Sequence, residues 1–215
     1  DITVGKMASG IYSSVFYNCK DLTNITVDKE CLLYDDRDNC NAIIEKASNK
    51  LLLASKKAVI PKSVTSISGN AFPAHADMDL TVPESVKSID TYAFNGVNRL
   101  YFESETPAAI NGNIFGWGAI YVPVSAYETY CNANVWSNYK NRIVTTEIAE
   151  KSVEVYSTEG MSGILDAIGL NEIDKVVKLK VKGEINSYDI IVFRDKMPLL
   201  NDLDLSEATV IASSK

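Results

Sequence analysis

The middle of the chain repeats itself. The run IPKSVTSISGNAF at residues 60–72 returns 22 positions later as VPESVKSIDTYAF at residues 82–94, with seven identical positions. A fixed period of this length is typical of proteins that are built by stacking small repeated units. One unit of this size cannot bury its own apolar face, so successive units must share a single core. We therefore expect a stacked-repeat architecture.

Each copy places apolar residues where stacking would bury them. Phe72 and Phe94 close the two copies, and Phe16 holds the same place in an earlier, incomplete copy. We expect the three phenylalanines to stack from unit to unit, so that truncation of Phe72 or Phe94 to alanine costs about 3–5 kcal/mol. A strand-like piece follows each phenylalanine, at residues 25–27, 80–82 and 100–102.

Residues 28–59 depart from the period. Residues 35–39 form a polar turn cluster, and two apolar runs, 42–45 and 50–54, flank a second polar turn. Short apolar runs on either side of a polar turn indicate a β-hairpin. We expect this hairpin, inserted near residues 40–56, to project from one unit and to rejoin the array at residues 59–60.

A third and less regular copy follows the two clear ones. We expect its core positions to be taken by Ile110, Ile114 and Phe115, and its next short strand to lie at residues 120–122. Glycine tolerates positive φ angles and close backbone approach, so we expect tight corners at Gly112, Gly116 and Gly118.

The period changes between residues 125 and 143. Apolar and aromatic residues there fall three and four positions apart, which is the spacing of one face of a helix. Ser125 followed by Glu128 fits a capping box, which predicts that the helix begins at Ser125. We expect a capping helix near 125–143 that covers the last apolar face of the array.

Residues 144–215 carry a second pattern. Two strand-like pieces, 179–181 and 203–205, lie 24 positions apart. Between them, residues 188–197 read as a helix that Pro198 ends, with Ile190, Ile191 and Phe193 directed inward. Before them we expect a strand at 152–156 and a helix at 159–170, with one apolar face made of Met161, Ile164, Leu165 and Ile168. The last repeat has no cap, so we expect the natural protein to continue, or this end to pack on something.

At these residues the chain resembles the BspA-type leucine-rich repeats of bacterial surface proteins. The motifs that carry the resemblance are VIPKSVTSISGNAF, TVPESVKSIDTYAF, the upstream run DDRDNCNAIIEKASNKLLLASKKAVIP and the segment IYVPVSAYETYCNANVWSNYKNRI. The resemblance covers residues 1–143 well and the rest more loosely. It implies an α/β leucine-rich-repeat solenoid, in which short strands form a sheet and irregular turns and short helices lie on the other side.

The resemblance also implies a domain organisation and a cellular place. Residues 1–143 would form a BspA-type domain with the inserted hairpin and the capping helix, and residues 144–215 a second, shorter and truncated leucine-rich-repeat-like segment. The family implies exposure on the cell surface or secretion, adhesion to host matrix proteins in some members, and no cofactor. No basic and apolar leader opens the sequence, so export is implied by the resemblance alone.

Composition excludes some classes of partner. The net charge is −7 and the isoelectric point is about 4.8. Binding to nucleic acid phosphates or to anionic membranes needs a basic face, so this acidic balance disfavours both. No apolar run approaches the length of about 20 residues that a membrane-spanning helix needs, so we expect no transmembrane segment in this chain.

The sequence contains four cysteines, Cys19, Cys31, Cys40 and Cys131, whose spacing fits no zinc site. Cysteine often behaves as a small buried hydrophobe, so we expect buried free thiols, with Cys19 in a core position of its repeat. A disulfide between Cys31 and Cys40 is the main alternative.

Three groups of residues could carry chemistry, and each has a simpler interpretation. His75, with Asp77 close by, could serve as a general base, but a histidine in a turn is more simply exposed to solvent. The oxygens of residues 35–41 could suggest calcium, yet the spacing of a calcium loop fails, because Cys40 and Asn41 fall at its fifth and sixth positions. The cluster is then a solvated loop, made of Asp35, Asp36, Asp38, Asn39 and Asn41.

Aromatic residues near the third copy could form a platform for sugars, or could pack the last coil against the capping helix. We favour packing, because aromatic side chains gain much from burial; the residues are Trp117, Tyr121, Trp136 and Tyr139. Asp202 and Asp204 share one face of a strand without any mark of catalysis. Phosphate-binding and nucleophile-elbow motifs are missing from the sequence. We assign no catalytic, cofactor-binding or metal-binding residue, and the ligand-binding residues stay unassigned.

Two functions of different classes remain. The first is a binding module that holds a host or bacterial protein or a glycan, and the second is a structural spacer within a longer surface protein. An exposed aromatic or apolar patch would favour binding, and a charged sheet face without features would favour the spacer. An enzyme is a distant third interpretation, which would require a concave pocket with strongly perturbed titratable groups.

Overall fold

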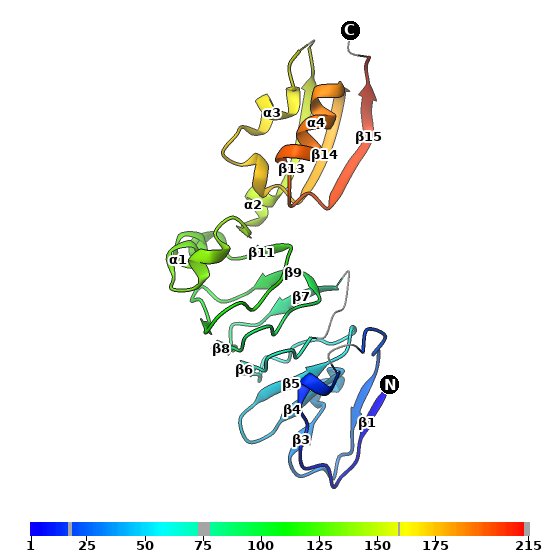
Figure 1. Ribbon diagram of the computed structural model, residues 1–215, viewed down its shortest axis with the longest axis vertical. Helices are drawn as coiled ribbons and strands as arrows, with labels where there is room; N and C mark the ends of the chain where they lie inside the picture. Colours follow the sequence, from blue (N-terminus) through cyan, green and yellow to red (C-terminus); the bar gives the residue numbers. More distant parts are fainter. Residues whose placement is uncertain (17–18, 73–77, 159, 213–215) are drawn as a thin grey trace. The chain divides into compact units, whose positions relative to one another are not determined.

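The computed structural model describes residues 1–16, 19–72, 78–158 and 160–212 (Figure 1). It is a mixed α/β structure with several sheets, and the chain divides into two compact units. Unit 1 comprises residues 1–140 and unit 2 comprises residues 141–215. The repeated run lies in unit 1, and the pair of strands 24 positions apart lies in unit 2. In the described part of the chain, no helix is long and apolar enough to cross a membrane.

The repeats of unit 1 meet in a ladder of very short parallel strands. Strand β6 (Ser66–Ile67) pairs with β8 (Ser88–Ile89), and β8 pairs with β10 (Ala109–Ile110). The register sets Ile67 opposite Ile89 and Ile89 opposite Ile110, so equivalent positions of successive copies are neighbours. Side chains alternate between the faces of a strand, so the isoleucines point into the core while the residues before them point outward. All three isoleucines are buried.

A second set of parallel strands repeats this logic. Strands β11 (Ala119–Tyr121), β9 (Val97–Phe102) and β7 (Met78–Val82) lie in this order. Leu80, Leu100 and Ile120 face one another across the three strands and are buried. Figure 1 shows these strands side by side in the middle of the colour scale. Each repeat thus contributes one strand to each ladder.

The phenylalanines of the two clear copies stack as expected. The ring centroids of Phe72 and Phe94 are 5.5 Å apart, and both side chains are fully buried. Backbone hydrogen bonds run alongside, because Phe72 N donates to Ala93 O and Phe94 N donates to Ile114 O. Phe115 is also buried. The prediction is confirmed for Phe72 and Phe94.

Phe16 lies in different surroundings. It ends the short 3-10 helix η1 (Ser13–Phe16), is half-buried, and packs against the N-terminal apolar cluster. That cluster includes residues of the parallel strands β1 (Ile2–Val4) and β2 (Ile25–Val27). Phe16 makes no ring contact with Phe72 or Phe94. The prediction that Phe16 continues their stack was therefore wrong.

The hairpin is confirmed, but the prediction that it projects from the array was wrong. Strand β4 (Ala42–Glu45) and strand β5 (Lys50–Ala54) pair antiparallel. They do not project, because β5 pairs with β6 and β4 pairs with β3 (Tyr34–Asp35), giving the sheet order β10-β8-β6-β5-β4-β3. The physical reason is burial, since four aliphatic side chains of the hairpin have no exposed surface: Ile43, Ile44, Leu51 and Leu53.

The capping segment is broken into three short helices and is not one helix over 125–143. These are η3 (Val124–Ala126), α1 (Tyr127–Asn132) and η4 (Trp136–Tyr139). Ser125 does not cap α1, because its hydroxyl donates to Glu105 Oε1 at 2.8 Å. The segment is held by buried hydrogen bonds to the array: Tyr130 Oη donates to Ser104 O, and Trp136 Nε1 donates to Ala108 O.

Unit 2 is built on three parallel strands with helices on one face. The order is β13 (Glu150–Tyr156), β14 (Lys178–Ile185) and β15 (Asp202–Val210), and Leu179 pairs with Leu203 as the 24-residue spacing predicts. Helix α3 (Gly163–Ile168) contacts β13, and helix α4 (Ser187–Lys196) contacts β14 (Figure 1). The smaller elements are β12 (Ile143–Val144), α2 (Thr146–Ala149) and the 3-10 helix η5 (Ile173–Lys175). A 3-10 helix of unit 1, η2 (Arg37–Asn39), follows β3.

The predicted inward faces of both helices of unit 2 need correction. Ile190 and Ile191 of α4 are 46% and 45% exposed, while Asp189 and Val192 are buried. In α3 the helix begins only at Gly163, so Met161 lies outside it and is exposed. The reason is local: Asn186 caps α4, and Asp189 closes a capping box that turns its own carboxylate inward.

The Asp189 carboxylate ties three segments of unit 2 together. Its two oxygens accept hydrogen bonds from Ser157 Oγ and Ser162 Oγ, both at 2.6 Å, and from the amides of Asn186 at 2.8 Å and Ile164 at 3.1 Å. Burial alone would raise the pKa of Asp189, but these hydrogen bonds outweigh it and hold the pKa below its usual value. The group therefore stays ionised inside the unit and fixes the turn after β13 and the starts of α3 and α4.

Candidate ligand-binding surfaces

The face of the unit 2 sheet that the helices leave open carries rows of polar side chains. The register places Lys178 between Glu150 and Asp202, and Lys182 between Glu154 and Glu207. Lysines therefore occupy the middle strand, and acidic residues occupy the strands on either side. The face is striped by charge, and the exposed Tyr156 lies at the end of β13 on the same face.

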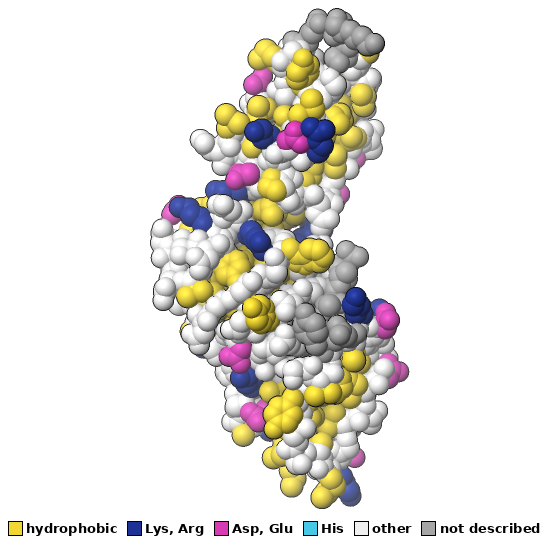
Figure 2. All heavy atoms as spheres, in the orientation of Figure 1, with side chains coloured by type: hydrophobic (Ala, Val, Ile, Leu, Met, Phe, Trp, Pro, Cys, Tyr) yellow, Lys and Arg dark blue, Asp and Glu magenta, His cyan; other side chains and the backbone are white. Residues whose placement is uncertain are grey.

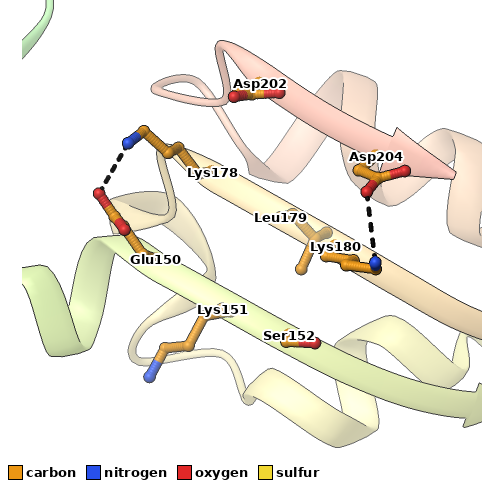
Figure 3. A pocket seen from close by; sticks show the side chains of 8 residues that line it. All are labelled: Glu150, Lys151, Ser152, Lys178, Leu179, Lys180, Asp202 and Asp204. Atoms are coloured by element: carbon orange, nitrogen blue, oxygen red, sulfur yellow. Dashed lines mark hydrogen bonds and ion pairs between the residues drawn. The ribbon is translucent and has the colours of Figure 1, made fainter.

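Ion pairs within the face compensate most of its charge. Lys178 Nζ lies 2.9 Å from Glu150 Oε1, and Lys180 Nζ lies 3.6 Å from Asp204 Oδ2 (Figure 3). Glu207 binds both Lys180, at 2.5 Å, and Lys182, at 2.8 Å. The hydrogen bond with Glu207 raises the pKa of Lys180, and the hydrogen bonds from both lysines lower the pKa of Glu207. These groups are thus fully charged near neutral pH.

A shallow hollow of about 280 Å³ lies at one end of this face. Figure 3 shows its side chains, which come from β13, β14 and β15. Asp202 and Asp204, which share one face of β15, line it beside the paired lysines. Except for Asp202, each charged side chain that lines this hollow is held by a neighbour, so the hollow suits solvent better than a specific ligand.

A larger hollow of about 480 Å³ lies over the first sheet of unit 1, and we call it the N-terminal hollow. Its floor is a row of side chains from three neighbouring strands, because the register sets Tyr34 opposite Glu45 and Glu45 opposite Lys50. The segment 9–14 forms its wall. That segment is fixed from both sides, since Ile11 packs against the N-terminal apolar cluster and Ser13 Oγ donates to Gly69 O at 2.5 Å.

Some polar groups of the N-terminal hollow have hydrogen-bond or ion-pair partners within the protein, and others do not. Lys50 Nζ pairs with Asp90 Oδ2 at 2.7 Å, and Glu45 accepts a hydrogen bond from the Ser48 hydroxyl. Tyr34 is only 5% exposed and packs in the N-terminal apolar cluster, and its hydroxyl has no hydrogen-bond partner among the residues that the structure describes without being one of the buried unsatisfied atoms. Tyr12 stands in the wall with 73% of its side chain exposed. The hollow therefore combines an exposed aromatic ring, a tyrosine hydroxyl without a protein partner among the described residues, and two charged groups that are each paired on one side.

A third hollow of about 400 Å³ lies at the corner of the repeats, beside η2. Pro61 and Pro83, which occupy equivalent positions of two copies, form its apolar side together with Val59, which is 68% exposed. Cys40 lines its floor, and burial raises the pKa of this thiol to about 11. Such a thiol is protonated at neutral pH and is not a nucleophile.

The polar loop that could have suggested calcium is held by its own contacts. Arg37 donates to both oxygens of Asp35, at 2.8 and 2.9 Å, and to the side chain of Asn49. The backbone takes positive φ angles at Asp38, Asn39 and Asn41. Within the described ranges, no group of three or more His, Cys, Asp or Glu side chains is placed to hold a metal ion. His75 and Asp77 lie outside the described residues.

The aromatic residues near the capping segment mostly pack inside. Tyr121, Trp136 and Tyr139 are buried, and the rings of Trp136 and Tyr130 meet edge to face at 5.0 Å. The packing interpretation is confirmed for these three residues. Trp117 is the exception, because 59% of its side chain is exposed.

All four cysteines are free thiols. Cys31, Cys40 and Cys131 are buried, which confirms the first interpretation and contradicts the Cys31–Cys40 disulfide. The predicted core position of Cys19 was wrong, because this residue is exposed. The physical reason is that Leu22 and Ile25 supply the buried side chains of this turn and strand.

The sequence interpretation missed the residues of the N-terminal hollow. A signal existed for two of them, because the predicted hairpin already places Glu45 opposite Lys50 at its turn. Nothing in the sequence marked Tyr34 as the next strand or placed segment 9–14 over it, since both depend on contacts between distant parts of the chain. The capping-box pattern of Asn186 and Asp189 was readable in the sequence and would have identified the buried carboxylate.

Comparison with known proteins agrees with the repeats seen in unit 1. No curated protein matches the chain. Residues 42–116 match the family model of the BspA type leucine-rich repeat region, in six copies. The matched stretch begins at β4 and ends before β11. It contains β6, β8 and β10 of the first ladder and β7 and β9 of the second. Within residues 42–116 the chain is therefore similar to the BspA-type leucine-rich repeats.

Proposed function

We propose that this protein is a non-catalytic repeat protein, displayed on the bacterial cell surface or secreted, that binds a protein or glycan ligand through unit 1. In this proposal the repeats are successive coils of a solenoid, and each coil contributes one strand to each of the two parallel ladders. Unit 2 is a second, shorter leucine-rich-repeat-like segment, which the pairing of Leu179 with Leu203 supports. Repeat scaffolds of this kind often bind other proteins, and their ligands are set by the surface and not by the fold.

The observation that carries the proposal is the N-terminal hollow. It brings an exposed aromatic ring, Tyr12, next to a row of polar side chains on an open sheet face. Concave sites with a few convergent polar groups are the usual places for ligands. Figure 2 shows, on the face it draws, hydrophobic side chains over the N-terminal part of unit 1 and over unit 2, while basic side chains are scattered.

The pairing of the charged groups supports binding over catalysis. A general base or a nucleophile has to be free to reach the substrate and poised near the working pH. Lys50 is held by Asp90 and Glu45 by Ser48, and the thiol of Cys40 is protonated. Groups fixed in this way can donate and accept hydrogen bonds to a bound ligand without exchanging a proton.

The spacer is the second candidate function, and the unit 2 sheet favours it for that part of the chain. Mixed charges that pair with one another keep a surface soluble and leave little net attraction for a partner. Lys178, Lys180 and Lys182 are each tied to a carboxylate of a neighbouring strand. We therefore place ligand binding in unit 1 and a solubilising, spacing role in unit 2.

A binding assay with the whole chain tests the proposal. The protein is passed over immobilised extracellular-matrix proteins and over an array of defined glycans. We expect saturable binding to at least one of them, and loss of that binding in Tyr12→Ala. Trp117→Ala is the matched control, because it removes another exposed aromatic side chain of unit 1 that does not line the hollow. Silence on both surfaces, or equal losses in the two variants, would contradict the proposal.

A further inference from the structure

We propose that the N-terminal hollow is a saccharide site and that it takes a neutral oligosaccharide. The inference rests on the proposed function, because it names the ligand class of the surface through which unit 1 binds. It is carried by four features of the hollow: the row of polar side chains on its floor, a tyrosine hydroxyl without a protein partner among the described residues, an exposed ring, and the local balance of charge.

The floor presents its polar groups at a regular spacing. Tyr34, Glu45 and Lys50 lie on three neighbouring strands in one register row. Neighbouring strands are about 4.8 Å apart, so the row spans about 10 Å. Such a row is longer than one sugar ring and offers contacts to two linked rings. Ser68 lines the same hollow from the next coil of the array.

The hydrogen-bonding groups match a ligand that is rich in hydroxyls. The carboxylate of Glu45 only accepts hydrogen bonds, the ammonium group of Lys50 only donates them, and the phenol of Tyr34 can do both. The Tyr34 hydroxyl has no partner within the described part of the chain and is not one of its buried unsatisfied atoms, so it is available to a ligand in the hollow. A sugar hydroxyl both donates and accepts, so neighbouring hydroxyls of one ring can satisfy these three groups together.

Tyr12 supplies the apolar contact that a sugar ring needs. The electron-rich face of an aromatic ring attracts the polarised C–H groups on one face of a pyranose. Tyr12 stands in the wall of the hollow, above the polar floor, with most of its side chain free. A ring bound there would stack on Tyr12 while its hydroxyls reach the floor.

Charge and backbone pairing narrow the ligand class. The charge of Lys50 is compensated by Asp90, which leaves Glu45 as the remaining charge of the floor row. An acidic sugar would meet this carboxylate, so a neutral one is favoured. An extended peptide would bind by adding a strand to a free sheet edge. Strands β4 and β5 each pair on both sides, and β3, which ends the sheet, is only two residues long and offers a peptide little edge.

The test uses the whole chain on an array of neutral, sialylated and uronic oligosaccharides, followed by titration calorimetry with the best neutral ligand. We expect binding to neutral oligosaccharides, and a weakening of about 3- to 10-fold in Tyr34→Phe, which loses a single hydrogen bond to the ligand. Tyr12→Ala should weaken binding at least as much. Trp117→Ala should bind like the wild type. Because the Tyr34 hydroxyl has no protein partner among the described residues, Tyr34→Phe should unfold at the same denaturant concentration as the wild type.

The outcomes separate this inference from the proposed function. If the protein binds matrix proteins but no neutral oligosaccharide of the array, the saccharide site is wrong and the proposed binding function still holds. Neutral sugars that bind equally to the wild type, Tyr12→Ala and Tyr34→Phe would place the site elsewhere and overturn the inference. Preference for sialylated or uronic sugars would contradict the charge argument. Silence on every surface would remove both proposals.

Discussion

The buried carboxylate of Asp189 gives the sharpest prediction about unit 2. Its four hydrogen bonds come from Ser157, Ser162 and two backbone amides. Hydrogen bonds to a charged group contribute about 1.5–3 kcal/mol each, and they do not add. Breaking a buried charged network by removing one partner costs about 3–5 kcal/mol. We therefore expect Asp189→Ala to lower the free energy of unfolding of unit 2 by about 3–5 kcal/mol, a large part of the usual stability of a small domain.

Asp189→Asn removes the charge of this side chain and keeps nearly the same shape. Each oxygen of Asp189 accepts from one serine and one amide, so an asparagine leaves either the Asn186 amide or the Ile164 amide facing an NH₂ group. We expect a cost of about 1–3 kcal/mol, the penalty for one unsatisfied buried donor. Asp202→Asn, the same change at an exposed position of β15, is the control and should alter stability by less than about 0.5 kcal/mol.

The same carboxylate makes unit 2 sensitive to acid. The pKa of Asp189 is lower in the folded state than in the unfolded chain, so its stabilising effect is complete above the unfolded pKa, near about 3.9. The effect is lost as the pH falls through the lower, folded pKa. Hydrogen exchange of the β14 amides reports the free energy of unfolding of unit 2. It therefore measures both the cost of the Asp189 substitutions and the loss of stability in acid. The reasoning fails if Asp189→Asn matches the control, or if it loses stability in acid as steeply as the wild type.

Two further predictions concern backbone space and thiol chemistry. Gly183 and Gly169 both have positive φ angles, but an alanine Cβ would lie 2.2 Å from Val155 O at Gly183 and would meet nothing within 4 Å at Gly169. In urea denaturation, Gly169→Ala should lower the free energy of unfolding by about 1–2 kcal/mol, and Gly183→Ala should lower it clearly more. Equal losses in the two variants would refute the steric argument. Iodoacetamide should label Cys19 of the native protein and spare Cys31, Cys40 and Cys131 at neutral pH, as read by mass spectrometry. Uniform labelling, or a mass that shows a disulfide, would contradict the burial of the three thiols.

Local periodicity predicted the repeats well because it reports burial directly. Ile67, Ile89 and their strands follow from the 22-residue period, since equivalent positions of stacked copies must be neighbours. The hairpin at 42–54 follows from two apolar runs around a turn. Its place inside the sheet did not follow, because pairing of β5 with β6 depends on which face meets which neighbour.

The errors came from contacts that compete with a local pattern. Ser125 looked like a helix cap, but its hydroxyl binds Glu105 of the array. Ile190 and Ile191 looked like an inward face, but the capping box at Asn186 and Asp189 rotates the helix so that a carboxylate points inward. The N-terminal hollow was not predictable either, because its wall and floor come from segments that only the tertiary fold brings together.

Successive repeats of unit 1 share one core, and Phe94→Ala tests this most directly. Both tryptophans of the chain, Trp117 and Trp136, lie in unit 1, so their fluorescence in a urea titration follows this unit. We predict a single transition whose free energy of unfolding falls by about 3–5 kcal/mol, while the exposed substitution Tyr12→Ala leaves it unchanged. A loss below about 1 kcal/mol, or two separate transitions within unit 1, would show that the repeats have cores of their own and would contradict the account.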